Sequence, residues 1–254
     1  ASSSSGAGNG PEKTIDGSGL NAQGLHSVDA QAMWFSGSGA DPTWIQYQFD
    51  GLYKLHQMLV WNYNTNLEPV IGLGVKTVTI DYSRDGVAWT TMGTTQEVAR
   101  APGVDAYAAN TTIDFGGAAA KYVRITIANN WGGILKQYGL SEVRFLVIPV
   151  TARQPVPASG ATGVDTRSIL SWRAGRDAGK HQVYLSTDVN EVRNGKTLAG
   201  TASGTSFDAG GVLQLGKTYY WKVNEVNDLA DPAVWEGQVW SFSTVAFLPV
   251  DDME

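Results

Sequence analysis

Short runs in which apolar and polar residues alternate constrain this chain more than any other feature. In the run 45–49, Ile45, Tyr47 and Phe49 fall on one side and two glutamines on the other, which is the period of a half-buried strand. Long helical periodicity is missing. Similar strand-like runs fill the first half of the chain, at 55–60, 75–82, 122–128 and 141–147. The sequence therefore predicts an all-β first half.

A proline-rich stretch follows, with Pro149, Pro155 and Pro157 within nine positions. Prolines at this density do not suit a central strand, so we expect a semi-rigid linker that runs into the edge of a sheet. Beyond it lie further strand-like runs, at 169–172, 181–186, 218–226 and 239–245. Their spacing and turn signals predict a second, smaller β-sandwich. We expect two domains, 1–149 and 150–254.

Composition excludes several classes of site and partner. The chain of 254 residues has no cysteine, so disulfides and thiolate metal sites are excluded, and its histidines lie too far apart for an HExxH zinc motif. Each half carries 12 acidic and 9 basic residues, a net charge of −3, which argues against nucleic acid or an anionic membrane as partner. No apolar run approaches the length of a membrane span. The chain begins at Ala1 without a Met and ends in the acidic segment 251–254, so we expect a mature or excised segment.

The second half resembles a fibronectin type III-like domain over about residues 152–246. The resemblance is carried by YYWKV at 219–223, VWSFST at 239–244 and LSW at 170–172. We expect three tryptophans of these runs to fill the core between two sheets, namely Trp172, Trp221 and Trp240. Trp235 lies in the loop 228–237 by this interpretation, where its side chain could be exposed, but a single loop tryptophan does not make a site. The second half is accordingly interpreted as a spacer.

Five segments of the first half, in order, carry a second resemblance. They are KTIDG at 13–17, WIQYQF at 44–49, IDYSRDGVAW at 80–89, KYVRI at 121–125 and GLSEV at 139–143. Together they resemble the discoidin, or coagulation-factor type C, family, which overlaps the galactose-binding-like carbohydrate-binding modules; 80–89 is the most specific piece. The resemblance implies an eight-stranded, jelly-roll-like β-sandwich that binds ligands with loops at one end. The segment 18–34 is longer than is usual in that family.

Several residues of these segments have a structural interpretation. Asp85 and Gly86 suit a tight turn, because glycine accepts positive φ and aspartate caps its own backbone. We expect Trp44 and Trp89 to cover the ends of the sheet. Arg124 lies on a strand between apolar neighbours and is expected to form a cross-strand ion pair.

The resemblance also implies a structural calcium ion that ties the early loop to the last strand. Carried over residue by residue, its ligands are the Asp16 and Glu142 carboxylates, the Lys13 carbonyl and Ser18, with Ser27 as a further possibility. Calcium takes six to eight oxygen ligands, carboxylates and backbone carbonyls among them. The alternative is a simple Asp-Gly turn and a glutamate that caps backbone N–H groups.

A sugar site needs an aromatic face and planar polar groups, and two loop segments offer both, 61–66 and 129–133. The principal candidates are Asn62, Asn130 and Trp131, although Trp131 alternatively seals the end of the sandwich. Supporting candidates come from the same segments and other loops, namely Asn64, Asn129, His26, Trp34, Arg100 and Tyr138.

The sequence thus predicts a non-catalytic carbohydrate-binding module of a larger secreted bacterial protein, which targets that protein to a glycan or polysaccharide. The alternative is a protein- or cell-surface-adhesion module without sugar specificity. Glu68, Asp105 and Asp114 are carboxylates of the kind glycosidases use, but no catalytic motif surrounds them. We expect no nucleic-acid or membrane partner, and a monomeric segment within a multidomain chain.

Overall fold

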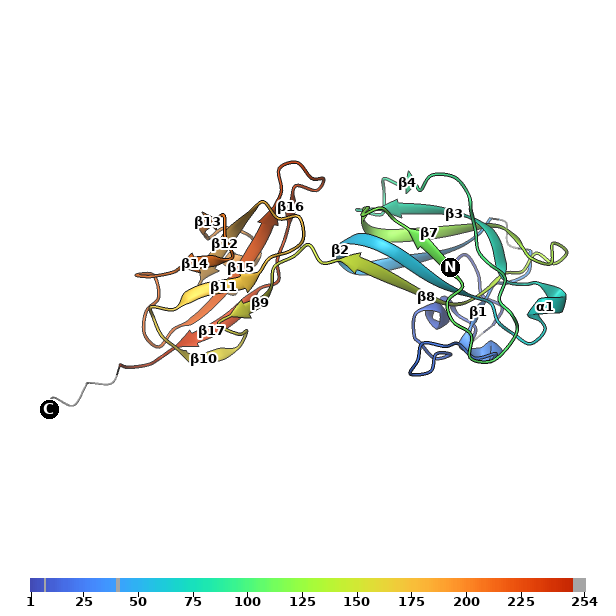
Figure 1. The fold of residues 1–254 in the computed structure, drawn as a ribbon, viewed down its shortest axis with the longest axis horizontal. Helices are drawn as coiled ribbons and strands as arrows, with labels where there is room; N and C mark the ends of the chain where they lie inside the picture. Colours follow the sequence, from blue (N-terminus) through green and yellow to red (C-terminus); the bar gives the residue numbers. More distant parts are fainter. Residues whose placement is uncertain (7, 40–41, 249–254) are drawn as a thin grey trace. The chain divides into compact units, whose positions relative to one another are not determined.

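The computed structural model describes residues 1–6, 8–39 and 42–248 (Figure 1). The chain divides into two compact units, Ala1–Ile148 and Pro149–Glu254, and strands dominate both. The predicted all-β class is confirmed. Within the described ranges, no helix has the length and apolar character needed to cross a membrane. The acidic segment 251–254 lies outside the described residues.

Strands and a few short helical turns make up the first unit. In chain order they are η1 Pro11–Thr14, η2 Ala30–Ala32, β1 Trp34–Phe35, β2 Thr43–Asn62, α1 Glu68–Ile71, β3 Val75–Ser83, β4 Thr90–Thr91, β5 Gln96–Glu97, β6 Thr111–Asp114, β7 Ala119–Asn130 and β8 Gly139–Ile148. Hydrogen bonds order the strands β1-β8-β2-β7-β3-β4, with β5 on β3 and β6 on β2. Figure 1 shows α1 at the end of the unit away from the point where the chain leaves β8.

The long strand β2 belongs to both layers of this sandwich. Its first half pairs with β7, where Ile45 lies opposite Ile125, and its second half pairs with β8 and β6. The register shifts between Gln48 and Tyr53, where the strand passes from one layer to the other. Both halves contribute to a single buried core of aliphatic and aromatic side chains, and the ring of Tyr47 contacts that of Phe145 at 5.3 Å. The predicted β-sandwich is therefore confirmed.

The most specific sequence motif forms the predicted turn. Gly86 has φ of +79°, and Asp85 Oδ1 accepts hydrogen bonds from Val87 N at 2.8 Å and Ala88 N at 2.9 Å. This arrangement lowers the pKa of Asp85, chiefly through those two backbone donors.

The prediction for the aromatic residues around Arg124 is corrected. The guanidinium lies over the rings of Trp44 at 5.4 Å and Trp89 at 4.1 Å, and it donates to Gln46 Oε1. Trp44 and Trp89 therefore enclose a cation instead of covering the ends of the sheet. Cation–π contacts and an amide take the place of the expected ion pair, because the strand register puts Gln46 opposite Arg124.

The second unit consists of two sheets. Its elements are β9 Arg153–Val156, β10 Ala161–Val164, β11 Ile169–Arg173, β12 Lys180–Ser186, α2 Val189–Arg193, β13 Leu198–Ala202, β14 Ser206–Asp208, β15 Thr218–Val226, β16 Val234–Trp235 and β17 Trp240–Thr244. One sheet has the order β10-β17-β15-β12-β13 with β16 on β15, and the other has the order β14-β11-β9. The proline-rich stretch enters β9, which is an edge strand as predicted.

Tryptophans fill the core of the second unit. Trp172, Trp221 and Trp240 are buried in one apolar cluster, which confirms their predicted role. The sequence places Trp235 in a loop, but it lies on β16 and is only 9% exposed, so that placement is wrong. The reason is local pairing, because Trp235 lies on β16 opposite Glu225 of β15 instead of in an open loop.

Candidate functional site

Three loops of the first unit meet where β2 ends, and we call residues 63–74, 98–110 and 131–138 the loop end. Gly132 N donates a hydrogen bond to Gly72 O over 2.7 Å and so joins the first loop to the third. Gly72 has φ of +70°, and a Cβ there would lie 2.5 Å from Gly132 N. The close approach of the two loops therefore requires glycine at this position.

Asn62, at the end of β2, is buried beneath these loops. Its Nδ2 donates to Val75 O at 2.7 Å and Ala99 O at 2.8 Å, and its Oδ1 accepts from Tyr63 N. The side chain has 0% exposure, and all its polar atoms are bonded within the protein. The prediction that Asn62 contacts a ligand is therefore wrong, because its amide binds the flanking segments together.

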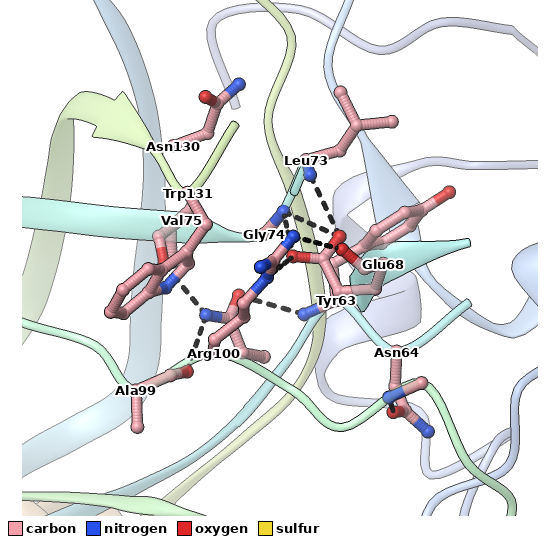
Figure 2. A network of polar contacts seen from close by, with 12 residues as sticks. Tyr63, Asn64, Glu68, Leu73, Gly74, Val75, Ala99, Arg100, Asn130 and Trp131 are labelled. Carbon is pink, nitrogen blue, oxygen red and sulfur yellow. Dashed lines mark hydrogen bonds and ion pairs between the residues drawn. The ribbon is translucent and has the colours of Figure 1, made fainter. Parts of the chain in front are cut away.

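Glu68, the first residue of α1, is buried beside Asn62. Its carboxylate accepts from Leu73 N at 2.8 Å and Gly74 N at 3.1 Å, and Arg100 Nε lies 3.7 Å from Oε1 (Figure 2). Burial raises the pKa of this carboxyl, and the two backbone donors and Arg100 oppose that rise. Glu68 thus closes the tight turn that follows α1.

Asn64 and Asn130 hold the other two loops in place through hydrogen bonds from their side-chain amides to loop carbonyls. Nδ2 of Asn64 donates to Val104 O over 2.7 Å, and Nδ2 of Asn130 donates to Leu135 O over 2.7 Å. Both side chains are buried, so these two predicted ligand contacts are also corrected to structural residues. Asn62, Asn64, Glu68 and Asn130 are called the inner polar layer below.

A hollow of about 380 Å³ opens beside this layer. Asn66 lies at the hollow, is exposed, and has no side-chain hydrogen bond within the described residues. Clefts that hold small ligands begin at roughly 300 Å³, so the hollow has room for a sugar ring. The lining residues come from segment 28–30 and the first loop: Val28, Ala30, Tyr63, Thr65, Asn66, Leu67, Glu68, Ile71 and Leu73.

Trp131 is half-buried on the other side of Glu68, next to Arg100 (Figure 2). Its indole Nε1 donates to Val98 O over 3.0 Å, and Lys76 Nζ lies 4.7 Å from the ring centroid. The N–H is thus committed to the protein and a cation occupies one ring face. These contacts favour the alternative in which Trp131 seals the end of the sandwich.

Arg100 and Asn129 keep part of their surface open. Arg100 donates to Glu68 O over 2.5 Å, and a third of its side chain is exposed. Asn129 is exposed, and its Oδ1 accepts from Thr77 N over 3.1 Å. Their role in binding stays a prediction.

Three further candidates are buried and cannot face a ligand. Trp34 and Tyr138 pack in the main core, and Trp34 Nε1 donates to Ser3 O over 3.1 Å. His26 has 0% exposure and pairs with Tyr107 through backbone hydrogen bonds. The long early loop therefore folds back into the unit, which alternation in the sequence does not indicate.

The two carboxylates of the expected calcium site are close enough to interact. Burial raises the pKa of Glu142 to about 7, and the charge of Asp16 contributes to that rise. Glu142 is 2% exposed, and within the described part of the chain its buried Oε2 has no hydrogen-bond partner. A buried carboxylate oxygen without a partner, within electrostatic range of a second carboxylate, is chemistry that a hard cation satisfies, and the cation already near Glu142 is Arg144, with Nε 3.6 Å from Oε1.

The remaining candidate metal ligands surround Asp16. Ser18 N donates to Asp16 Oδ1 over 2.8 Å, and Lys13 Nζ lies 3.2 Å from Oδ2. In the described residues no three acidic or histidine side chains form a cluster, so the other oxygens must be carbonyls, hydroxyls or water. The donor set fits calcium provided that the Lys13 ammonium moves off Asp16.

Sequence reasoning missed the residues that line the hollow. Thr65 and Asn66 lie in the segment 61–66, which the sequence indicated as part of a sugar site. The candidates predicted from that segment were Asn62 and Asn64, which are buried. Leu67 and Ile71 carry no sequence signal for binding. Of the carboxylates considered for catalysis, Glu68 is committed to backbone donors, and Asp105 and Asp114 are exposed.

Comparison with known proteins gives one family. The family model described as F5/8 type C domain matches residues 1–138. No curated protein matches the chain.

Solved structures similar to the chain cover roughly its first half. CBM32-3 from a family 31 glycoside hydrolase from Clostridium perfringens is 21% identical, with a TM-score of 0.41, over 57% of this chain and 86% of that chain. The F5/8 type C domain of a Bacteroides fragilis protein is 17% identical, with a TM-score of 0.40, over 55% of this chain and 81% of that domain. A family 89 glycoside hydrolase from Clostridium perfringens is 17% identical, with a TM-score of 0.40, over 57% of this chain, and the match spans 13% of the enzyme.

Proposed function

Because the chain belongs to the F5/8 type C domain family through residues 1–138, we propose that its first unit is a non-catalytic module that binds a saccharide at the loop end. The module would serve a larger secreted bacterial protein by holding it on a glycan or polysaccharide. Attachment of this kind raises the local concentration of a linked domain even when the single site is weak.

The hollow beside the inner polar layer is the observation that carries this proposal. It joins apolar walls to the open amide of Asn66, and sugar recognition needs both an apolar surface and planar hydrogen-bonding groups. The layer beneath it fixes the loops before a ligand arrives, so binding does not have to order them.

A second function, adhesion to a protein surface, is favoured by a different observation. Aliphatic side chains project from all three loops of the loop end, and Val70 and Ile134 are 83% and 89% exposed. Exposed apolar groups gathered in one place mark surfaces for protein contact. The exposed members are Leu67, Val70, Val104, Ile134 and Leu135.

We further propose that a structural calcium ion binds between the early loop and β8. The Asp16 and Glu142 carboxylates would hold it, with oxygens of Lys13 and Ser18 nearby. The buried, unpartnered Oε2 of Glu142 supports this assignment. When bound, the ion would supply positive charge that links two segments far apart in the sequence.

For the second unit we propose a fibronectin type III-like spacer. Trp172, Trp221 and Trp240 are used in its own core, which supports a structural role. Neither unit is proposed to catalyse a reaction, and the chain is proposed to act as a monomeric segment of its parent protein.

A glycan array probed with the full chain tests the saccharide proposal. Asn66→Ala removes the open amide and is expected to reduce binding about tenfold, because a lost hydrogen bond to the ligand worth roughly 1.4 kcal/mol corresponds to that factor. Gln214→Ala, which removes an exposed amide from the second unit, is the matched control and should leave binding unchanged.

Trp131→Ala separates the two sides of the loop end. Loss of binding in Trp131→Ala with full binding in Asn66→Ala would move the site from the hollow to the indole. An array without any response, together with capture of a purified protein partner, would favour adhesion instead.

A further inference from the structure

The walls of the hollow are mainly apolar. Val28, Ala30, Leu67, Ile71 and Leu73 contribute aliphatic side chains. Leu67 and Ile71 are 60% and 38% exposed, so their apolar surface is available to a ligand. A sugar that enters must therefore place part of its own surface against hydrocarbon.

The polar groups of the hollow are largely engaged by the protein. Glu68 accepts hydrogen bonds from two backbone N–H groups, and the Tyr63 hydroxyl interacts with Thr65. The Asn66 amide remains open. The hollow can thus satisfy a few sugar hydroxyls but not a set of them distributed around the whole ring.

Because the hollow has apolar walls and few open polar groups, it distinguishes between substituents on the exocyclic carbon of a hexose. A hydroxymethyl group placed against Leu67 and Ile71 would lose part of its hydration, and these two side chains offer it no hydrogen-bond partner in return. A methyl group in the same place gains apolar contact and loses nothing. A carboxylate there would share the hollow with the Glu68 carboxyl, whose charge disfavours a second negative group.

We infer that the hollow selects a 6-deoxyhexose, a sugar with a methyl group where its parent hexose has a hydroxymethyl group. This inference rests on the saccharide binding proposed above and specifies the class of sugar. The methyl group lies against the walls formed by Leu67 and Ile71, and Asn66 binds ring hydroxyls.

Matched sugar pairs test this selection in the full chain. Methyl glycosides of L-fucose and L-galactose differ at that one position, as do those of L-rhamnose and L-mannose. NMR titration is expected to show about 10-fold to 100-fold tighter binding of the 6-deoxy member in at least one pair, which is the range over which an apolar pocket rejects an added hydroxyl. The glycoside of a uronic acid is the charged comparison and is expected to bind more weakly than the 6-deoxy member.

A variant of the wall shows whether the hollow makes this distinction. Leu67→Ser removes exposed hydrocarbon, so the protein should fold normally and the affinity ratio within the pair should fall toward one. Val87→Ser, at an 83% exposed position in the turn after β3, is the matched control and should retain the ratio.

The outcomes separate this inference from the function beneath it. Equal affinity within both pairs, tighter binding of the hexoses, or an unchanged ratio in Leu67→Ser overturns the selection of a 6-deoxyhexose. A positive glycan array without response to any 6-deoxyhexose also overturns it while saccharide binding stands. Absence of binding to every sugar on the array overturns both.

Discussion

The inner polar layer and the hollow above it contain the same side-chain chemistry but use it differently. Asn62, Asn64 and Asn130 are buried and bonded to the backbone of neighbouring loops, whereas Asn66 is exposed and its side chain has no hydrogen-bond partner among the residues that the structure describes. Asn64 and Asn66 are two residues apart in sequence. A buried amide that is bonded to the backbone of a loop determines the shape of that loop, whereas an exposed amide is available to a ligand.

Removal of an inner amide should have the largest effect on stability. Asn62→Ala leaves buried Val75 O and Tyr63 N without these side-chain partners, at roughly 1 to 3 kcal/mol for each unsatisfied group, and removes one of the two amide donors to the half-buried Ala99 O. We expect a loss of about 3 kcal/mol in the free energy of unfolding, measured with urea. A loss below about 1 kcal/mol would contradict the role given to this layer.

The proposed calcium ion is expected to have the next largest effect. A ligand that binds only the folded state at about 100 times its Kd stabilises it by roughly 2.7 kcal/mol. Chelation should therefore lower the Tm, and addition of calcium should restore it. Glu142→Gln should remove this response, and equal Tm values with chelator and with calcium in the unaltered protein would refute the site.

Glu68 should produce a smaller effect that depends on pH. Its pKa is raised in the folded protein, chiefly by burial, so the folded state holds the proton more tightly than the unfolded state. The contribution of Glu68 to stability is therefore greatest below the ordinary glutamate pKa and declines as the pH rises toward the folded value. Glu68→Gln should lack that decline, so the unaltered protein should lose stability relative to the variant across this range. If the difference in the free energy of unfolding between the unaltered protein and Glu68→Gln stays constant with pH, the raised pKa of Glu68 is contradicted.

Asn66→Ala should have the smallest effect on folding. An exposed side chain without a partner contributes within about 0.5 kcal/mol, so its Tm should match that of the unaltered protein. Saccharide affinity should nevertheless fall about tenfold. This combination is the reverse of Asn62→Ala, and a destabilised Asn66→Ala would remove the contrast between the two regions.

The sequence predicted the strands well because their signal is local. Alternation at 75–82 and the Asp85–Gly86 turn both depend on neighbours in the chain, and the structure has β3 at Val75–Ser83 followed by that turn. The core role of Trp172, Trp221 and Trp240 was expected because large aromatic side chains on the strands of a sandwich usually pack between its sheets.

The candidate site was predicted less well because burial of an amide depends on contacts distant in sequence. Asn62 is buried because residues 75 and 99 come to it, and Asn64 because 103 and 104 do. Nothing in the segment 61–66 distinguishes these asparagines from Asn66. Trp235 was mistaken for a loop residue for a similar reason, since its partner Glu225 lies on another strand.

The central proposal is that a saccharide occupies the hollow beside Asn66. The most direct test is backbone NMR of the full chain during titration with a saccharide that binds on the array. We predict that amide shifts change at Ala30 and between Thr65 and Leu73, and little elsewhere. Shifts confined to the surroundings of Trp131 or to the second unit would contradict it.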